Sequence, residues 1–340
     1  MSAVAGWDIG GAHVKLALVE SGAVQATTQH PCPLWLGLEE LRRALADARS
    51  RVSDTATHAV TLTGELVDLF PDRATGVHEI LEVVRRELSA DTRVYAGPAG
   101  LLSLDAASER PLDVASANWH ASAQLLALRG ARGVLVDIGS TTTDIVPVSN
   151  GKVGHHHVGD HQRLISGELV YTGVMRTPVL GLTHHLKVRG IRVPLMAEMF
   201  ATMADVYRLN GELPDDADPW PTADDGPGDE EGSARRLLRM VGLDLDIAHG
   251  VTLARELAEQ LRDVQLRLLV QAFRQVASGL PGAVIGAGSG RFLVRAMAQE
   301  LERECVSYEQ ACGIDTGEAP ELANFAPALA VALLLEAGHG

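Results

Sequence analysis

The stretch that most constrains the fold is residues 133–147, which read GVLVDIGSTTTDIVP. Aliphatic residues lead into Asp137 and a second apolar run follows Asp144, so a strand is expected on each side of a tight turn. The turn exposes backbone N–H groups and hydroxyls, which suit a phosphate chain. The turn residues that carry these donors are Gly139, Ser140, Thr141 and Thr142. The stretch therefore predicts a phosphate-binding β-hairpin.

The chain opens with the same pattern. Residues 4–19 read VAGWDIGGAHVKLALV, which is again a strand, a turn at Gly10 and Gly11, and a strand. Asp8 and Asp137 begin the two turns, 129 residues apart. A strand–turn–strand pattern that occurs once in each half of a chain indicates two related lobes. Lys15, on the strand after the first turn, either offsets phosphate charge or faces solvent.

A third glycine-rich turn follows a short apolar strand at residues 283–291, AVIGAGSGR. Its candidate binding residues are Gly286, Gly288, Ser289 and Gly290, which come just before an expected helix.

The carboxylates of the two hairpins are candidate metal ligands. Mg²⁺ prefers one or two carboxylates together with water and phosphate oxygens. Asp8, Asp137 and Asp144 are therefore expected to hold Mg²⁺ or another divalent cation. The alternative for Asp8 is a turn residue that hydrogen-bonds its own backbone.

Length and charge limit the class of protein. A chain of 340 residues is long enough for two lobes, because single hydrophobic cores stop growing near about 250–300 residues. The net charge of −15 argues against binding to nucleic acid or to an anionic membrane. Three cysteines without CxxC spacing, and no targeting segment before the first strand, favour the cytoplasm. The sequence does not decide whether the protein forms a homo-oligomer.

Strands and helices alternate in the manner of an α/β protein. We expect an N-terminal lobe over residues 1–130 and a C-terminal lobe over 131–340. Continuous helices are expected over 111–128 and 196–209, and a strand over 152–158. Residues 212–232 are rich in acidic residues and proline, which predicts an exposed excursion from the second lobe.

Several other side chains are candidate ligands for a metal or for pyrophosphate. Within the excursion, Asp218, Asp224 and Asp225 belong either to a solvated loop or to a substrate lid or second metal site. A run of three histidines at 155–157 suggests a metal, but neighbours on a strand point to opposite faces. Arg163 and Arg176 are either pyrophosphate clamps, since a guanidinium binds phosphate oxygens in pairs, or partners in surface or interlobe ion pairs.

The three turns, in this order, resemble the actin-like ATPase superfamily of sugar kinases, actin and Hsp70 chaperones. The segment DIGSTTTDI is similar to the hydantoinase/oxoprolinase branch. Longer motifs resemble one small family that accompanies tetrahydromethanopterin-linked one-carbon metabolism and includes the aminomethylfuran-forming synthase of methanofuran biosynthesis. These motifs are CPLWLGLEEL, LTGEL, ASANWHA, SGELVYTGVMRTPV and FATMADVYRLNGEL.

This resemblance implies a two-lobed, actin-like (ribonuclease H-like) α/β fold, with a mixed sheet flanked by helices in each lobe and a cleft between them. It also implies a transferase that joins an aminomethylfuran-methyl diphosphate to the phenol of γ-glutamyltyramine and releases pyrophosphate. Glu65, His120 and Glu168 are candidates for the base that takes the phenol proton. ATP is not required in this reaction, so the third turn either holds an organic substrate or is inherited architecture.

Two rival functions remain open from the sequence. The first is an ATP-dependent small-molecule kinase, because the adenosine-type turn is retained. The second is a nucleotide switch that acts on a protein partner.

Overall fold

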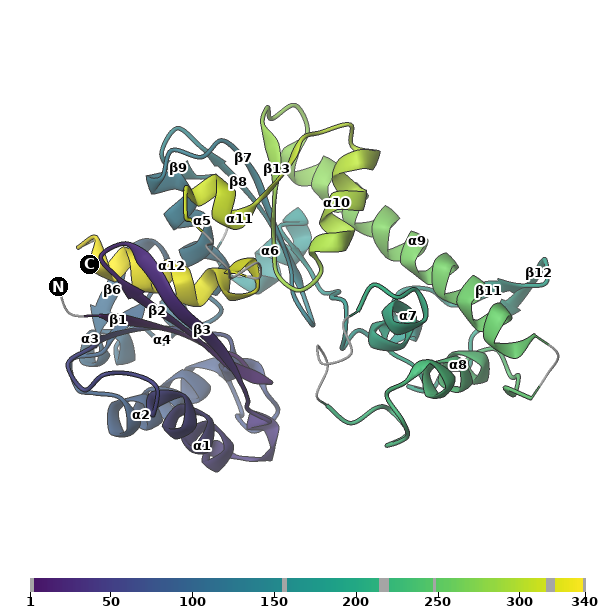
Figure 1. Ribbon diagram of the computed structural model, residues 1–340, viewed down its shortest axis with the longest axis horizontal. Helices are drawn as coiled ribbons and strands as arrows, with labels where there is room; N and C mark the ends of the chain where they lie inside the picture. The colour runs from purple at the N-terminus through teal and green to yellow at the C-terminus, as the bar shows by residue number, and fades with distance from the viewer. Residues whose placement is uncertain (1–2, 155–157, 214–219, 247–248, 316–321, 339–340) are drawn as a thin grey trace.

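The computed structural model describes residues 3–154, 158–213, 220–246, 249–315 and 322–338 (Figure 1). The first sheet has the order β3-β2-β1-β4-β5-β6. β1 pairs antiparallel with β2 and parallel with β4, so the sheet is mixed. Its strands are β1 (Val4–Ile9), β2 (His13–Glu20), β3 (Ala23–Pro31), β4 (Thr57–Leu62), β5 (Arg93–Tyr95) and β6 (Leu101–Ser103).

The second sheet repeats the central part of the first. Its order is β10-β8-β7-β13-β14, with β9 paired to β8. β7 is antiparallel to β8 and parallel to β13, as β1 is to β2 and β4. The strands are β7 (Gly133–Ile138), β8 (Thr143–Ser149), β9 (Lys152–Val153), β10 (Leu169–Val170), β13 (Ala283–Ala287) and β14 (Cys305–Ser307). A separate ribbon consists of β11 (His185–Val188) and β12 (Ile191–Pro194).

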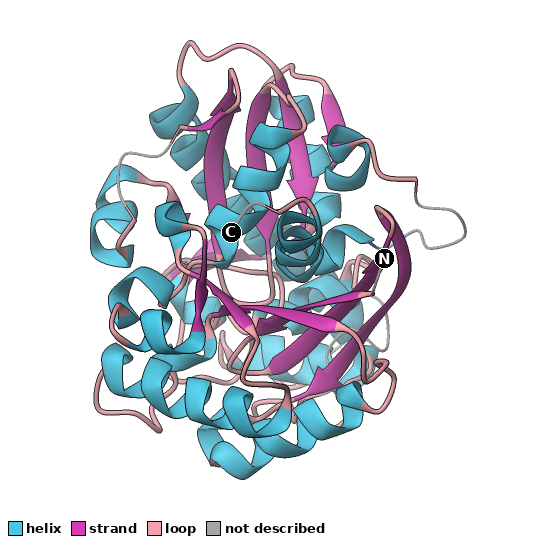
Figure 2. Ribbon diagram, turned by 90° about the vertical axis from the view of Figure 1, so that its left-hand side faces the viewer, coloured by secondary structure: helices cyan, strands magenta, loops and turns pink. Residues whose placement is uncertain are grey.

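Helices flank both sheets (Figure 2). None of those in the described part of the chain is long and apolar enough to cross a membrane. The α-helices are α1 (Leu38–Arg49), α2 (Arg73–Glu87), α3 (Leu104–Ser108), α4 (Pro111–Val114), α5 (Asn118–Leu128), α6 (Asp160–Ser166), α7 (Met203–Leu209), α8 (Glu230–Arg239), α9 (Gly250–Ala277), α10 (Arg291–Glu300), α11 (Tyr308–Cys312) and α12 (Ala326–Glu336).

The last helix, α12, returns to the first sheet. It lies beside β1 and β2 in Figure 1. The approach is close, because a Cβ atom on Gly6 would lie 2.0 Å from the Ala328 carbonyl oxygen. α12 and α5 share one buried cluster with residues of both sheets, including Val4 and Ile285. The two halves therefore share a buried core. The lobe boundary between residues 130 and 131 stays a prediction.

Three local expectations are wrong. The predicted helix over 111–128 is two helices, α4 and α5, because Ser116 between them has a φ of 52° and cannot continue a right-handed helix. The predicted helix over 196–209 is only α7, which begins after a capping box between Thr202 and Asp205. The predicted strand over 152–158 is limited to β9, and residues 155–157 lie outside the described residues.

Candidate active site between the two hairpins

Both hairpin turns open onto one cavity of about 600 Å³. This volume is typical of sites for small organic molecules. Most of the residues that the sequence singled out line it: Asp8, Gly10, Gly11, Lys15, Asp137, Gly139, Ser140, Thr141, Thr142, Asp144, Arg163 and Gly288. The cavity is therefore built from both halves of the chain, since its residues come from β1 and β2 and from β7 and β8.

The two hairpins have matching geometry. In the first, Asp8 pairs with Lys15 across the strands and the Gly10 amide donates to the His13 carbonyl at 2.9 Å. In the second, Asp137 stands opposite Asp144, and the Gly139 amide donates to the Thr142 carbonyl, also at 2.9 Å. Both predicted hairpins are confirmed. The difference lies in the residue that faces the first aspartate, a lysine in one hairpin and a carboxylate in the other.

Asp8 is buried and Asp137 is partly buried at the cavity. Burial raises the pKa of Asp8 to about 6, although the charge of Lys15 opposes the shift. Burial also raises the pKa of Asp137 to about 7, and the nearby Asp144 adds to the shift. Asp8 Oδ1 has no hydrogen-bond partner among the described residues. A cation or a cationic substrate group would relieve this unfavourable burial.

The donor set fits a hard divalent cation that is only partly coordinated by protein. Within the described residues, no group of three or more His, Cys, Asp or Glu side chains could enclose a metal ion. Mg²⁺ commonly takes one or two carboxylates and completes its shell with water and phosphate oxygens. Asp8 and Asp137 meet that requirement, and the assignment of a metal to them stays a prediction.

Asp144 already has a cationic partner. Arg163 Nη2 donates to Asp144 Oδ1 at 2.9 Å and to the Glu168 carbonyl oxygen at 3.1 Å. The Arg163 guanidinium lies 3.8 Å from the ring centre of Trp119, and the residue is only 1% exposed. Of the two alternatives for Arg163, the ion pair is therefore present. Because Asp144 is engaged there, Asp8 and Asp137 remain the better candidates for a metal.

Lys15 lies at the cavity. Its Nζ atom donates to the Asn324 carbonyl oxygen at 2.7 Å and stands 5.9 Å from the ring centre of Phe325. The residue is partly buried, and its charge acts on both Asp8 and Asp137. Lys15 therefore faces the cavity, and its role beside a phosphate stays a prediction.

The third glycine-rich turn packs against the second hairpin. Gly288 has a φ of 80°, and the Gly290 amide donates to the Ile138 carbonyl at 2.8 Å. Gly288 lines the cavity, whereas Gly286, Ser289 and Gly290 are not among its lining residues. A Cβ atom on Gly290 would lie 2.5 Å from the Ile138 side chain, so glycine is needed there for close packing. A binding role for this turn stays a prediction.

The three candidate bases lie in different surroundings. His120 is buried, and its Nδ1 atom is hydrogen-bonded to the Tyr95 hydroxyl at 2.8 Å. Glu168 is buried at the end of α6, and its carbonyl oxygen accepts from the Ile145 amide. Neither of these side chains lines the cavity, and neither does Glu65. Glu65, however, accepts a hydrogen bond of 2.8 Å from Ser116 Oγ, and Ser116 does line it.

Sequence reasoning missed Ser116 and Asp160. Ser116 Oγ also lies 3.4 Å from Asp160 Oδ2, which forms an ion pair with Arg73 at 2.8 Å. This network connects α2 with α6 and so bridges the two halves. Burial raises the pKa of Glu65, and its Oε2 atom has no hydrogen-bond partner among the described residues. No local pattern marks Ser116, because its segment has the composition of a helix.

The proposed second metal site is not supported. Asp224 forms ion pairs with Arg236 at 2.9 Å and Arg239 at 3.4 Å, so its carboxylate anchors the excursion to α8. Asp225 occupies a turn with a φ of 53°. Asp218 and the three histidines at 155–157 lie outside the described residues.

The family model for hydantoinase/oxoprolinase matches residues 56–325, which is most of the chain. The chain belongs to the hydantoinase/oxoprolinase family.

Two curated relatives of this family member carry one name, (4-{4-[2-(γ-L-glutamylamino)ethyl]phenoxymethyl}furan-2-yl)methanamine synthase. The one from Methanocaldococcus jannaschii is 29% identical over 336 residues, covering 98% of this chain and 97% of the relative. The one from Methanococcus vannielii is 28% identical over 212 residues, covering 60% of this chain and 90% of the relative. Both names denote a synthase, which does not favour the kinase alternative.

Among solved structures, nucleotide-free acetone carboxylase matches with a TM-score of 0.54 at 11% identity. The match covers 97% of this chain and 70% of that one, and it shows a shared fold only. The predicted fold class, an actin-like mixed α/β protein with two sheets flanked by helices, is confirmed.

Proposed function

We propose that this protein forms an aryl ether. The phenol oxygen of a γ-glutamyltyramine attacks the methylene carbon of an aminomethylfuran-methyl diphosphate. The bond between that carbon and the diphosphate oxygen breaks, pyrophosphate leaves with the electron pair, and the phenol proton passes to a base. The observation that carries the proposal is the cavity between two matching phosphate-type hairpins, each with an aspartate whose pKa is raised by burial. The names of the two relatives describe the corresponding ether product.

The leaving group has suitable partners on both sides of the cavity. The Gly10 and Gly139 amides close their turns, but Gly11 and residues 140–142 also bring their backbone to the cavity. Ser140 and Thr141 offer hydroxyls, and Lys15 offers a positive charge. Preorganised donors and charges of this kind stabilise the negative charge that develops as the carbon–oxygen bond breaks. A divalent cation held by Asp8 and Asp137 would supply Lewis-acid stabilisation to the same diphosphate.

Glu65 is the base that the contacts support best. It is joined to the cavity through Ser116 Oγ, so the phenol proton can pass to the Ser116 oxygen while the Ser116 proton passes to Glu65. The raised pKa of Glu65 improves its match to a phenol, whose ordinary pKa is about 10.

The setting follows from the same resemblance. We place the reaction in tetrahydromethanopterin-linked one-carbon metabolism and in the cytoplasm, where the free cysteines Cys32, Cys305 and Cys312 stay reduced. The substrates are two small molecules, and ATP is not a reactant.

The experiment is to follow pyrophosphate release by the purified protein with magnesium. We expect release only when both the furan diphosphate and γ-glutamyltyramine are present, without ATP and with ether formed in equal amount. The matched control replaces γ-glutamyltyramine by its O-methyl ether, which lacks the reacting hydroxyl. ADP formation from ATP with either organic molecule, and no ether, would overturn the proposal in favour of a kinase.

A further inference from the structure

Beside the phosphate-type turns lies a cluster of rings that the proposed chemistry has not yet used. Trp35 lies in the short 3-10 turn Leu34–Leu36, and its ring is 5.1 Å from that of Trp220 at an interplanar angle of 67°. Trp220 is also 5.4 Å from the ring of His13. The Arg176 guanidinium covers the Trp35 ring at 4.8 Å from its centre. We call these four residues the aromatic clamp.

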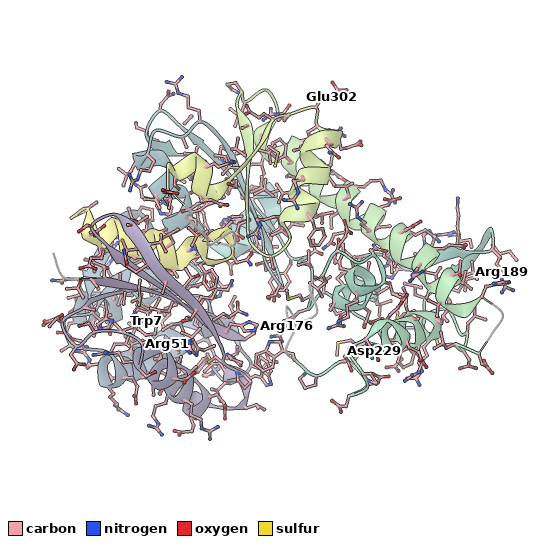
Figure 3. All side chains as sticks on the ribbon, viewed as in Figure 1. Trp7, Arg51, Arg176, Arg189, Asp229 and Glu302 are labelled. Atoms are coloured by element: carbon pink, nitrogen blue, oxygen red, sulfur yellow. The ribbon has the colours of Figure 1, made fainter. Side chains whose placement is uncertain are left out.

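The aromatic clamp is tied to both hairpins. The Leu34 amide donates to the Gly11 carbonyl at 3.1 Å, which fixes the turn that holds Trp35 behind the first hairpin. The Arg176 amide donates to the Ser140 carbonyl at 2.9 Å, which fixes Arg176 behind the second. Arg176 lies where the two halves of the molecule face each other (Figure 3). Anything that binds between Trp35 and Arg176 is therefore adjacent to the phosphate-type turns.

Three members of the aromatic clamp, Trp35, His13 and Arg176, line the cavity, together with the apolar side chains of Leu66 and Val67. This end of the cavity thus offers ring faces and hydrocarbon, whereas the hairpin end offers carboxylates, hydroxyls and Lys15. Such a division suits a molecule with an aromatic ring placed next to a diphosphate. The burial that lowers the pKa of His13 to about 4 keeps its ring neutral near neutral pH.

Arg176 covers the Trp35 face without being fixed by an ion pair. It is exposed, and no carboxylate among the described residues pairs with it. A guanidinium that stacks on a ring and keeps its N–H edge open can turn toward an anionic group of a ligand. The acceptor proposed above carries such a group, the free α-carboxylate of its glutamyl residue.

We propose that the Trp35 face now covered by Arg176 binds the phenol ring of the acceptor, and that Arg176 then pairs with the acceptor's carboxylate. Trp220, which packs edge-on against Trp35, is a positioning residue. The inference rests on the proposed function, because it takes the acceptor from that reaction. Stacking of two rings is worth a factor of about 10 in affinity.

The test has a binding arm and a kinetic arm. γ-Glutamyltyramine is titrated calorimetrically into the protein with magnesium and inorganic pyrophosphate, for the wild type, Trp35→Ala and Trp35→Phe. We expect about 10-fold weaker binding for Trp35→Ala and near-normal binding for Trp35→Phe. Pyrophosphate affinity is expected to be unchanged in all three. The matched control is Leu36→Ala, a 71% exposed neighbour in the same turn.

In the kinetic arm, Trp35→Ala should raise KM for the phenolic acceptor about 10-fold and leave KM for the furan diphosphate and kcat unchanged. Trp220→Ala should give a smaller rise that Trp220→Phe restores. A rise confined to the furan diphosphate would overturn the assignment of the phenol ring. If the wild type forms the ether and Trp35→Ala binds the acceptor normally, this inference is overturned and the proposed function stands. A wild type that forms no ether would overturn the proposed function.

Discussion

Gly288 lies against Asp137 so closely that a Cβ atom on the glycine would stand 2.4 Å from Asp137 Oδ1. The same atom would be 2.3 Å from the Ile138 carbonyl oxygen. The third glycine-rich turn therefore helps to set where the Asp137 carboxylate lies. This contact gives the turn a function in the cleft that needs no bound nucleotide.

The first prediction follows from that contact. Gly288→Ala should displace the Asp137 carboxylate and reduce pyrophosphate release at least about 100-fold, because small misplacements of catalytic groups are costly. Gly279→Ala is the matched control, since Gly279 has a similar φ of 76° but nothing within 4 Å of a Cβ atom. Both variants should lose some thermal stability from backbone strain, and only Gly288→Ala should lose activity. Equal activity in the two variants would contradict the role of the contact.

The second prediction concerns the first aspartate of each hairpin. Asp8→Asn and Asp137→Asn should each reduce turnover at least about 100-fold, because each removes a charge that organises the metal and the leaving group. Calorimetric titration should also detect weaker magnesium-dependent binding of pyrophosphate, a readout that does not need catalysis. Asp54→Asn is the control, with a fully exposed side chain. Near-normal turnover in either hairpin variant would remove that aspartate from the mechanism.

Local sequence was enough to predict the two hairpins. A run of apolar residues, a glycine turn and a second apolar run are all short-range features, and the structure has a strand on each side of both turns. The position of α12 could not be predicted in this way. Its apolar sequence suits any buried helix, and the contact that places it is between Gly6 and Ala328, more than 300 residues apart.

Sequence predicts the site only in part, because some of its residues are brought together by long-range contacts. Asp8, Asp137 and Lys15 follow from the hairpin pattern, and all three reach the cavity. His120 was a reasonable candidate by residue type, but its hydrogen bond to Tyr95 comes from another element and cannot be read locally. Ser116 shows the opposite error. Its segment favours a helix, yet contacts with Glu65 and Asp160 accompany a left-handed backbone there.

The third prediction concerns stability in acid. Burial lowers the pKa of His58 to about 4, and the Trp7 indole donates to His58 Nδ1 at 3.1 Å. The unfolded chain, with an ordinary His pKa near 6.5, therefore binds a proton more readily than the folded protein. The contribution of neutral His58 to the free energy of unfolding should be fully present above about pH 6.5. It should fall by up to about 3 kcal/mol as pH drops to about 4.

Urea unfolding at pH 7 and pH 5 measures this effect. His58→Gln keeps an acceptor for Trp7 but cannot be protonated, so its midpoint should fall less between the two pH values than that of the wild type. His78→Gln, a change at an exposed histidine, should behave as the wild type. The same pH response in all three proteins would show that other groups account for acid unfolding.

The last prediction separates Glu65 from the other buried carboxylates. Glu65→Gln should lower kcat about 100-fold and leave both KM values unchanged, because Glu65 accepts the phenol proton without touching the substrate. Ser116→Ala should have a similar effect, since it breaks the path between Glu65 and the cavity.

The wild-type rate should rise with pH through the raised pKa of Glu65, because only the ionised carboxylate can accept a proton. This rise should be missing in Glu65→Gln. Glu309→Gln is the matched control. Glu309 is also buried, and its Oε2 atom has no hydrogen-bond partner among the described residues, but Ser116, which links Glu65 to the cavity, bonds to Glu65 and Asp160. If Glu65→Gln keeps the wild-type pH profile, the proton goes elsewhere, and Glu168 becomes the next side chain to replace.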